Sequence, residues 1–281
     1  MNTRIRFGFV TCVKLGLACM EKIYEIGGSL DLAITLHDNI DTLKSGRVYL
    51  DDFANHRSIP LLKVKHINET VVEQRIRELH IDWLFVIGWS QIAGPRIIAA
   101  PRLGVLGIHP TLLPEGRGRA SIPWAILKGL DKTGVTLFML DEEVDAGPIL
   151  AQEVLSVGYQ EDATSLYSRV TEAHKTLLAN VWQGLEAGII DAVAQDETKA
   201  TYWQGRTPQD GEISSDMTVE EVDRLVRATT HPYPGAFVMD QKLGLVRIWS
   251  GQSMCNAGAK TGFCLKLRDG YFNASEFEIE S

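Results

Sequence analysis

Short apolar runs alternate with amphipathic helical patterns through the first part of the chain. The continuous apolar runs predict strands at 5–10, 30–36, 59–64, 84–87, 105–108 and 135–140. Between several of these runs, apolar residues at helical spacing predict helices at 15–26, 71–79 and 121–127. This alternation indicates an α/β fold, a Rossmann-like, mostly parallel sheet with helices on both faces. Ligands bind beyond the carboxyl ends of such strands, so we expect the chemistry to follow Val10, Ile87, Ile108 and Leu140.

The pattern changes after the longest helical stretch, which spans 163–187. Beyond it, turn-forming residues, a short helical pattern at 219–228 and several short strand patterns replace the regular alternation. We therefore predict a Rossmann-like catalytic domain over 1–190, followed by a linker and a small β-rich C-terminal domain over 191–281.

The amino-acid composition and net charge exclude several classes of protein. Hydrophobic residues make up 45% and charged residues 23% of the 281 residues, which is typical of a globular chain and excludes a disordered or fibrous one. The net charge of −8 argues against a global basic surface for nucleic acid or acidic membranes. No apolar run approaches the ~20 residues of a membrane span, and the first residues lack the apolar core of a signal peptide. We expect a cytoplasmic protein.

The cysteines and glycines exclude several kinds of site. Cys12, Cys19, Cys255 and Cys264 form no Cys-x-x-Cys motif, so the sequence predicts neither a disulfide framework nor a metal site. The Gly-x-Gly-x-x-Gly motif is missing after the first strand, which argues against a dinucleotide cofactor. These residues are therefore typical of a reduced enzyme or binding protein without a metal.

One histidine and one aspartate stand where chemistry is expected. His109 ends a predicted strand directly before Pro110, and Asp145 lies in an acidic loop after a later strand. A crossover that returns to the neighbouring strand would bring the two side chains to one edge of the sheet. A carboxylate favours the imidazolium, which stabilises an oxyanion or delivers a proton to a leaving amine, as acyl transfer requires. The alternative interpretation is a surface histidine and a turn or cap aspartate.

Four segments resemble one family over nearly the whole chain. They are HPTLLPEGRGRASIPWAI at 109–126, TGVTLFMLDEEVDAGPIL at 133–150, RTPQDGEI at 206–213 and RATTHPYPGAF at 227–237. This chain resembles the folate-dependent formyltransferases, which include glycinamide ribonucleotide, methionyl-tRNA and sugar N-formyltransferases. The resemblance implies transfer of a formyl group from 10-formyltetrahydrofolate to a primary amine, with no metal. It also implies that His109 and Asp145 are catalytic.

The sequence departs from the family at a third catalytic position. Family members carry an asparagine two residues before the histidine, and its amide donates a hydrogen bond to the oxyanion; this chain has Gly107 there. Loss of one such donor typically costs about 10²–10³ in rate. Three interpretations are open: water or another donor such as Thr111 replaces the amide, His109 and Asp145 suffice, or the chain is a weakened or inactive member.

The resemblance also implies where the pterin of the folate binds. Family members hold it between the loop after the fourth strand and the acidic loop before the catalytic aspartate. The residues at these positions are Gly88, Trp89, Ser90, Gln91, Ile92, Leu140, Asp141, Glu143 and Val144. For Trp89 and Ile92, packing into the core is the alternative interpretation.

The acceptor amine is predicted from the linker and the loop after His109. An aromatic pair can stack on a base, and arginines can meet a diphosphate. The residues expected to contact substrate are Thr11, Arg117, Arg119, Tyr202, Trp203 and Arg206. In this set of residues the chain resembles the branch of the family that formylates dTDP- or UDP-linked amino sugars for bacterial surface polysaccharides. The alternatives for the arginines are solvated surface charges, and for Tyr202 and Trp203 packing of the linker.

Other functions stay open at this stage. One is formylation of another small amine, such as hydroxyornithine, or of methionyl-tRNA, although the acidic chain lacks a basic run for tRNA. Another is a non-catalytic folate or nucleotide-sugar binder, because Gly107 replaces the family asparagine. Dimerisation is common in this family, so the resemblance also implies a possible homodimer through the C-terminal domain.

Overall fold

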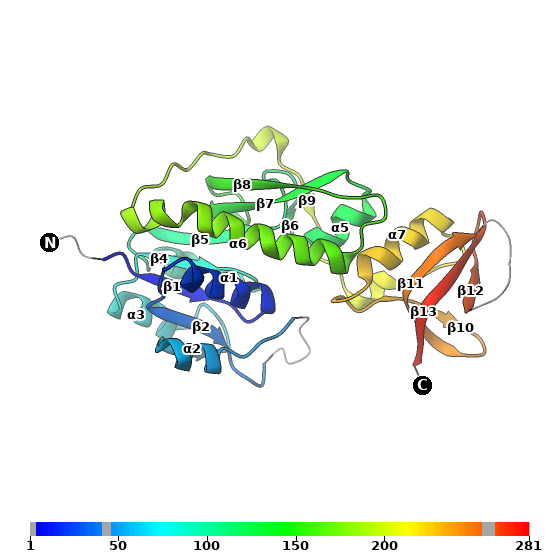
Figure 1. The fold of residues 1–281 in the computed structure, drawn as a ribbon, viewed down its shortest axis with the longest axis horizontal. Helices are drawn as coiled ribbons and strands as arrows, with labels where there is room; N and C mark the ends of the chain where they lie inside the picture. The colour runs from blue at the N-terminus through cyan, green and yellow to red at the C-terminus, as the bar shows by residue number, and fades with distance from the viewer. Residues whose placement is uncertain (1–3, 41–45, 255–261, 281) are drawn as a thin grey trace. The chain divides into compact units, whose positions relative to one another are not determined.

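The computed structural model describes residues 4–40, 46–254 and 262–280, and Cys255 lies outside them (Figure 1). Two compact units make up the chain. The first unit comprises Met1–Arg117, Gly134–Val154 and Val170–Tyr202, and the second comprises Gly118–Thr133, Leu155–Arg169 and Trp203–Ser281. The sequence predicted a single boundary near residue 190, with each domain continuous in sequence. In the structure, Gly118–Thr133 and Leu155–Arg169, which both precede residue 190, belong to the second unit.

The main sheet of the first unit has seven strands. Its order is β3-β2-β1-β4-β5-β7-β8. The strands are β1 (Phe7–Val10), β2 (Leu32–Leu36), β3 (Leu61–Val64), β4 (Trp83–Val86), β5 (Gly104–His109), β7 (Lys132–Met139) and β8 (Ile149–Ser156). From β3 to β5 the neighbours are parallel, whereas β7 runs antiparallel to β5. The predicted mostly parallel α/β fold is confirmed.

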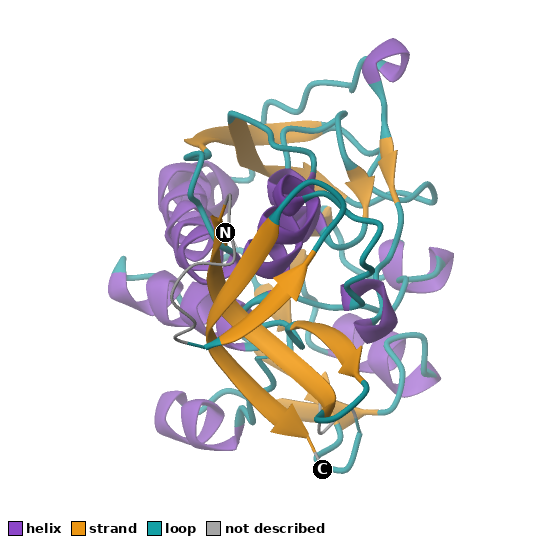
Figure 2. Cartoon of the chain, turned by 90° about the vertical axis from the view of Figure 1, so that its right-hand side faces the viewer, coloured by secondary structure: helices purple, strands orange, loops and turns teal. Residues whose placement is uncertain are grey.

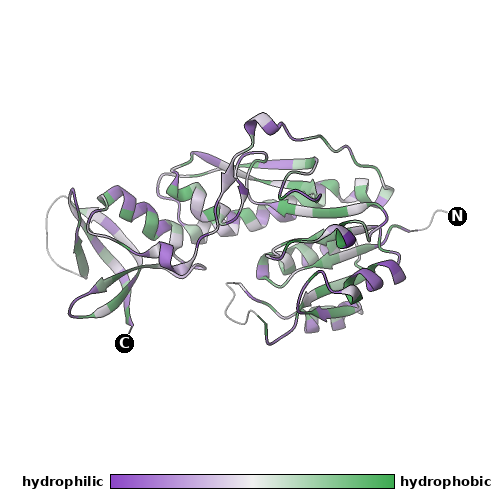
Figure 3. Cartoon of the chain, turned by 180° about the vertical axis from the view of Figure 1, so that it is seen from behind, coloured by the Kyte–Doolittle hydropathy of each residue, from purple (hydrophilic) through white to green (hydrophobic). Residues whose placement is uncertain are grey.

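Helices cover both faces of this sheet. The helices α1 to α4 and α6 are Lys14–Glu25, Asp51–Arg57, Thr70–Glu78, Pro95–Ile98 and Ala163–Ala187. On one face the Trp182 ring of α6 lies 4.4 Å from that of Phe7 in β1 and 6.3 Å from that of Phe85 in β4, centroid to centroid. On the other face α3 and α4 share a buried cluster with β1, β2 and β4, and these strands are apolar in Figure 3. Among the described helices, none is long and apolar enough to cross a membrane.

An antiparallel sheet and a helix form most of the second unit. The sheet has the order β10-β11-β13-β12, with strands Ala236–Asp240, Gly244–Met254, Tyr271–Glu280 and Phe263–Lys266 (Figure 2). Helix α7 (Val219–Thr229) buries Val222, Leu225 and Val226 against it. The predicted β-rich C-terminal part is therefore present, and α5 (Ser121–Leu127) packs against α7.

Short elements connect these parts. They are β6 (Arg117–Gly118), β9 (Tyr202–Trp203), and the 3-10 turns η1 (Glu197–Lys199) and η2 (Pro208–Gly211). Strand β6 pairs with β9, so the linker after α6 runs beside the loop that follows His109.

The direction of β7 differs from the prediction. A parallel crossover was expected between β5 and the strand before Asp145, but His109 pairs with Thr136 and Leu106 pairs with Met139. The segment after His109 thus returns to the same end of the sheet instead of crossing to the other end. Asp145 approaches His109 from the loop after β7 rather than from the carboxyl end of a parallel strand.

Helix α6 buries an ionisable group in the first unit. His174 is 2% exposed, and its Nδ1–H donates to the carbonyl of Val170 over 2.7 Å. Burial, with a smaller contribution from the nearby His109, lowers the pKa of His174 from 6.5 to about 4. His174 is therefore neutral at physiological pH.

This burial predicts a pH-dependent stability. Between pH 6.5 and pH 4 the unfolded chain binds a proton at residue 174 that the folded chain does not, so the free energy of unfolding falls as the pH falls through this range. The fully developed effect is about 3 kcal/mol. In His174→Asn, whose amide can still donate to Val170, urea denaturation is expected to show a smaller loss between pH 7 and pH 4.5. The matched control is His56→Asn, because His56 makes the same contact to Asp52 on an exposed helix face. Equal losses in His174→Asn and wild type would contradict the prediction.

Candidate active site

The end of β5 brings an imidazole and a carboxylate together. His109 is 7% exposed, and its Nε2 lies 2.8 Å from the carbonyl oxygen of Gly116. Its Nδ1 lies 3.5 Å from Oδ2 of Asp145. The expected proximity of the two side chains is therefore present, although the route by which the chain achieves it differs.

Buried hydrogen bonds hold the loop after His109. The hydroxyl of Thr136 in β7 donates to the carbonyl of Thr111 and accepts from the amide of Leu113. The amide of Gln152 in β8 donates to the carbonyl of Leu113 and to the same hydroxyl. Because β7 and β8 fix this loop, the carbonyl of Gly116 is available as an acceptor for His109.

The backbone places Asp145 in an uncommon conformation. Its φ angle is +56°, a region that side chains other than glycine rarely adopt without a local reason. The amide of Gln195 donates to the carbonyls of Asp145 and Gly147, at 2.8 Å each. The Asp145 side chain is 17% exposed.

The two ring nitrogens of His109 have different surroundings. Both face oxygen acceptors, and only the imidazolium can donate at both nitrogens. Nε2 is at hydrogen-bond distance from a backbone carbonyl, whereas the contact of Nδ1 with Asp145 is longer than a normal hydrogen bond. The edge of the ring that carries Nδ1 thus faces the carboxylate of Asp145.

Apolar side chains occupy the space above Gly107. A Cβ atom at this position would lie 2.4 Å from Cδ1 of Leu140 and 3.2 Å from Cε1 of Phe138. Apolar side chains therefore line the position two residues before His109, and Cδ1 of Leu140 would have to shift to admit a side chain there. The Thr111 hydroxyl is buried and has no hydrogen-bond partner among the described residues, but its burial closes it to substrate.

Two apolar side chains in the expected pterin segments are exposed. Ile92 is 68% exposed and Val144 is 48% exposed, so packing into the core does not account for either. Trp89 and Leu140, in contrast, pack against the same buried cluster of the first unit. Gly88 has a φ angle of +66° where the chain leaves β4.

The other residues of these segments are mainly polar and exposed. Gln91 is tied to the loop before α3, since it accepts from the amide of Ile67 and donates to the carbonyl of Lys65, both at 2.9 Å. Ser90 and Glu143 are exposed, and the exposed Asp141 accepts from the amide of Glu143. Backbone groups and exposed apolar side chains are thus the groups that these loops offer to a flat ring.

Two of the expected substrate contacts are fully buried. The hydroxyl of Thr11 accepts from the amide of Val13, and Thr11 is 0% exposed. Arg117 is also 0% exposed, and its five N–H groups donate to Gln195, Glu197 and Tyr202. Neither side chain presents a free donor surface to substrate, so we place Arg117 in the framework of the site.

The remaining expected contacts are more accessible. Tyr202 of the first unit is 66% exposed. In the second unit Arg119 is exposed, and the amide of Arg119 donates to the carbonyl of Trp203. Arg206 stacks on Trp124 at 5.2 Å, and partial burial lowers the pKa of its guanidinium.

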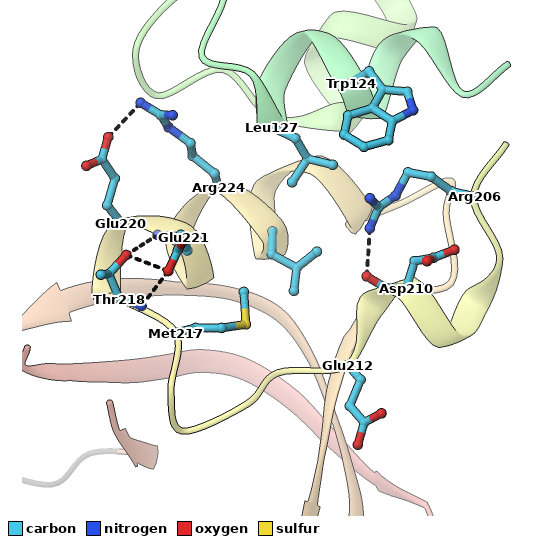
Figure 4. Close-up of a pocket in the computed structure, with 11 residues that line it drawn as sticks. Trp124, Leu127, Arg206, Asp210, Glu212, Met217, Thr218, Glu220, Glu221 and Arg224 are labelled. Atoms are coloured by element: carbon cyan, nitrogen blue, oxygen red, sulfur yellow. Dashed lines mark hydrogen bonds and ion pairs between the residues drawn. The ribbon is translucent and has the colours of Figure 1, made fainter. Parts of the chain in front are cut away.

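A pocket formed by described residues lies in the second unit (Figure 4). Its volume is about 460 Å³, and α5, α7 and the chain between them line it. Most of its polar groups already have partners: Arg206 donates to the carbonyl of Asp210, Arg224 pairs with Glu220, and Glu221 caps α7 through Thr218. Neither His109 nor Asp145 lines this pocket, so its size does not identify the reactive site.

Within the described ranges, no group of three histidine, cysteine, aspartate or glutamate side chains could hold a metal ion. The functional features missed by the sequence analysis are Gln195, Glu197 and the carbonyl of Gly116. They lie in a linker and a turn that have no motif, and their roles depend on contacts across the fold.

Comparison with known sequence families covers both units. Residues 48–182 match the family described as formyl transferase, and residues 206–270 match the family described as formyl transferase, C-terminal domain. The first match includes His109 and Asp145.

Solved structures show the same fold at low identity. HypX from Aquifex aeolicus, which has also been solved with tetrahydrofolic acid, is 17% identical with a TM-score of 0.73; the match covers 99% of this chain but 45% of that chain. WlaRD, a sugar 3N-formyl transferase solved in the presence of dTDP and 5-N-formyl-THF, is 16% identical with a TM-score of 0.72 and full coverage of both chains. The N-formyltransferase from Helicobacter canadensis, solved with folinic acid and dTDP-3-aminofucose, is 16% identical with a TM-score of 0.71, covering 98% of this chain and 100% of that one.

The two sequence matches together span most of the described residues and run through both the seven-stranded and the four-stranded sheet. The chain belongs to the formyl transferase family.

Proposed function

We propose that the protein transfers a formyl group from 10-formyltetrahydrofolate to the primary amine of a nucleotide-linked amino sugar. The observation that carries the proposal is the 3.5 Å contact between Nδ1 of His109 and the carboxylate of Asp145. Acyl transfer to an amine needs a group that stabilises an oxyanion and a route for protons between two nitrogens. This pair supplies both.

The reaction balances as a transfer between two amines. The acceptor nitrogen attacks the formyl carbon, the bond from that carbon to N10 of the folate breaks, and the acceptor loses one proton while N10 gains one. His109 stabilises the oxyanion and gives a proton to the leaving nitrogen through its Nδ1 edge. Asp145 favours the charged form of the imidazole and accepts the proton of the attacking amine.

The exposed apolar residues of two loops support a folate substrate. Ile92 and Val144 provide uncovered apolar surface in the segments where the family holds the pterin. The relatives WlaRD, the Helicobacter canadensis enzyme and HypX have been solved with reduced folates. The chemistry of the loops fits a flat ring bound by backbone groups and apolar contacts.

The proposal that the acceptor is a nucleotide sugar rests on two relatives, on three residues of this chain and on its net charge. Two of the relatives have been solved with dTDP or a dTDP-linked amino sugar. Arg119, Arg206 and the exposed Tyr202 remain the residues that we assign to the nucleotide. The net charge of −8 disfavours a tRNA acceptor, which needs neutralisation of phosphates.

A single assay tests the proposal. Purified protein is mixed with 10-formyltetrahydrofolate and a panel of dTDP- and UDP-linked amino sugars, with hydroxyornithine as an alternative acceptor, and release of tetrahydrofolate is followed. Turnover with an amino sugar supports the proposal. If nucleotide sugars bind but no tetrahydrofolate forms, the protein is a binder and the proposal is wrong.

The catalytic pair gives a first prediction. His109→Asn and Asp145→Asn each remove a proton-transfer group, so kcat is expected to fall about 10²–10⁴-fold. Both variants should keep the wild-type circular dichroism spectrum. His56→Asn and Asp191→Asn make the same exchanges at exposed positions and should keep wild-type rates. A near-wild-type kcat in either active-site variant would remove that residue from its role.

The space above Gly107 gives a second prediction. Gly107→Asn alone is not expected to raise kcat, because Leu140 and Phe138 occupy the position that the carboxamide would take. Combining it with Leu140→Ala creates room for the amide, so the double variant should be faster than Gly107→Asn. A tenfold rise in kcat for Gly107→Asn by itself would show that the apolar side chains do not block the position.

The folate contact gives a third prediction. Ile92→Asp places a charge where we assign apolar contact with the pterin, so the KM for 10-formyltetrahydrofolate should rise at least about tenfold, a cost near 1.4 kcal/mol. The KM for the amine should change little. Ile189→Asp is the control, since Ile189 is equally exposed at 69% but lies outside the assigned segments. Equal KM values for the folate in the two variants would argue against this site.

A further inference from the structure

The segment between α6 and β9 contacts both loops that carry the catalytic pair. It begins along the edge of the sheet, where Val193 and Ile149 of β8 exchange two backbone hydrogen bonds of 2.8 Å. It ends at Tyr202, where β9 pairs with β6. We call residues 193–202 the brace.

At its start, the brace holds the backbone of Asp145. Gln195 donates from Nε2 to the carbonyls of Asp145 and Gly147, at 2.8 Å each. These two bonds lie on either side of Ala146 and restrain the turn in which Asp145 has its positive φ angle. The position of the carboxylate therefore depends on where Gln195 lies.

At its end, the brace holds the backbone beside His109. The hydroxyl of Thr201 accepts from the amide of Gly116 at 2.8 Å, and the carbonyl of Thr201 accepts from the amide of Arg117 at 2.9 Å. The carbonyl of Gly116 is the group that lies 2.8 Å from Nε2 of His109. The orientation of the imidazole therefore depends on where Thr201 lies.

A buried guanidinium joins the two ends. Arg117 donates to Oε1 of Gln195 at 2.8 and 3.2 Å, to both carboxylate oxygens of Glu197 at 2.8 and 2.6 Å, and to the hydroxyl of Tyr202 at 3.0 Å. These bonds use all five of its N–H groups. A planar fork that is fully hydrogen-bonded has one orientation, so it fixes Gln195 relative to the backbone of residues 116 and 117.

We infer that Gln195 is a positioning residue for the formyl transfer: through Arg117 it sets the distance between Asp145 and His109. An amide is required at this position because its oxygen must accept from the guanidinium while its nitrogen donates to two carbonyls. A carboxylate of the same shape would keep the first contact and would face the carbonyls without a proton to donate. This role rests on the proposed function, which supplies the reaction that the pair performs.

The test compares Gln195→Glu with wild type in the full-length protein. We expect kcat to fall on the order of 10²-fold, the cost of misplacing a catalytic group by about 1 Å, with both KM values changed less than threefold. The fall should come with displaced imidazole nitrogen signals of His109 in the ¹⁵N spectrum of histidine-labelled protein. A residue needed only for folding would not separate kcat from KM in this way.

Controls separate this role from loss of structure. Gln74→Glu makes the same exchange at an exposed position of α3 and should change neither kcat nor the His109 signals. If Gln195→Glu does not fold, Gln195→Asn replaces it, because the shorter side chain keeps an amide but cannot span from Arg117 to both carbonyls. A folded variant at residue 195 with wild-type kcat and wild-type His109 signals would overturn the inference.

The spectrum also separates this inference from the proposed function. If wild-type protein formylates none of the acceptors, the proposed function fails, and the His109 signals still decide whether Gln195 positions the pair. Displaced signals in Gln195→Glu then support the brace, and unchanged signals refute it.

Discussion

The contact between Nδ1 of His109 and the carboxylate of Asp145 is the interaction on which the site depends. At 3.5 Å it is longer than a normal hydrogen bond, and the two side chains are only 9% and 17% exposed. Its geometry must therefore be imposed by the surrounding backbone. The structure meets this requirement at both partners, with the carbonyl of Gly116 at the imidazole and the amide of Gln195 at the carbonyl of Asp145.

Two other ionisable groups of the first unit, His174 and Arg117, are buried. His174 lies in the core of the same unit and is kept neutral, with a pKa of about 4, so it adds no positive charge beside His109. Arg117 is permanently charged but is fully occupied by the brace, with Glu197 as its counter-ion. The imidazole of His109 has the carboxylate of Asp145 as its neighbour at Nδ1.

Much of the fold could be predicted because helices and buried strands leave apolar patterns in the local sequence. Apolar periodicity identified α5 over 121–127 and α6 over 163–187 to the residue, and it identified the buried strands to within a few residues. The short helix α2 and the edge strand β8 were missed, since a short or half-exposed element carries little periodic signal. The antiparallel direction of β7 was missed because strand direction depends on how the connection packs.

The sequence by itself indicated the family, through segments that resemble the formyltransferases, and it predicted that His109 and Asp145 lie close together. Only the tertiary structure decided which other residues serve the site. Arg117 and Gln195 act through bonds to segments about 50 to 80 positions away along the chain, as in the bond from Arg117 to Glu197 and the bond from Gln195 to the carbonyl of Asp145. Likewise, Leu140 fills the space above Gly107 only because β5 and β7 lie side by side. Such contacts leave no periodic pattern, since they depend on how distant backbone segments pack rather than on neighbouring residues.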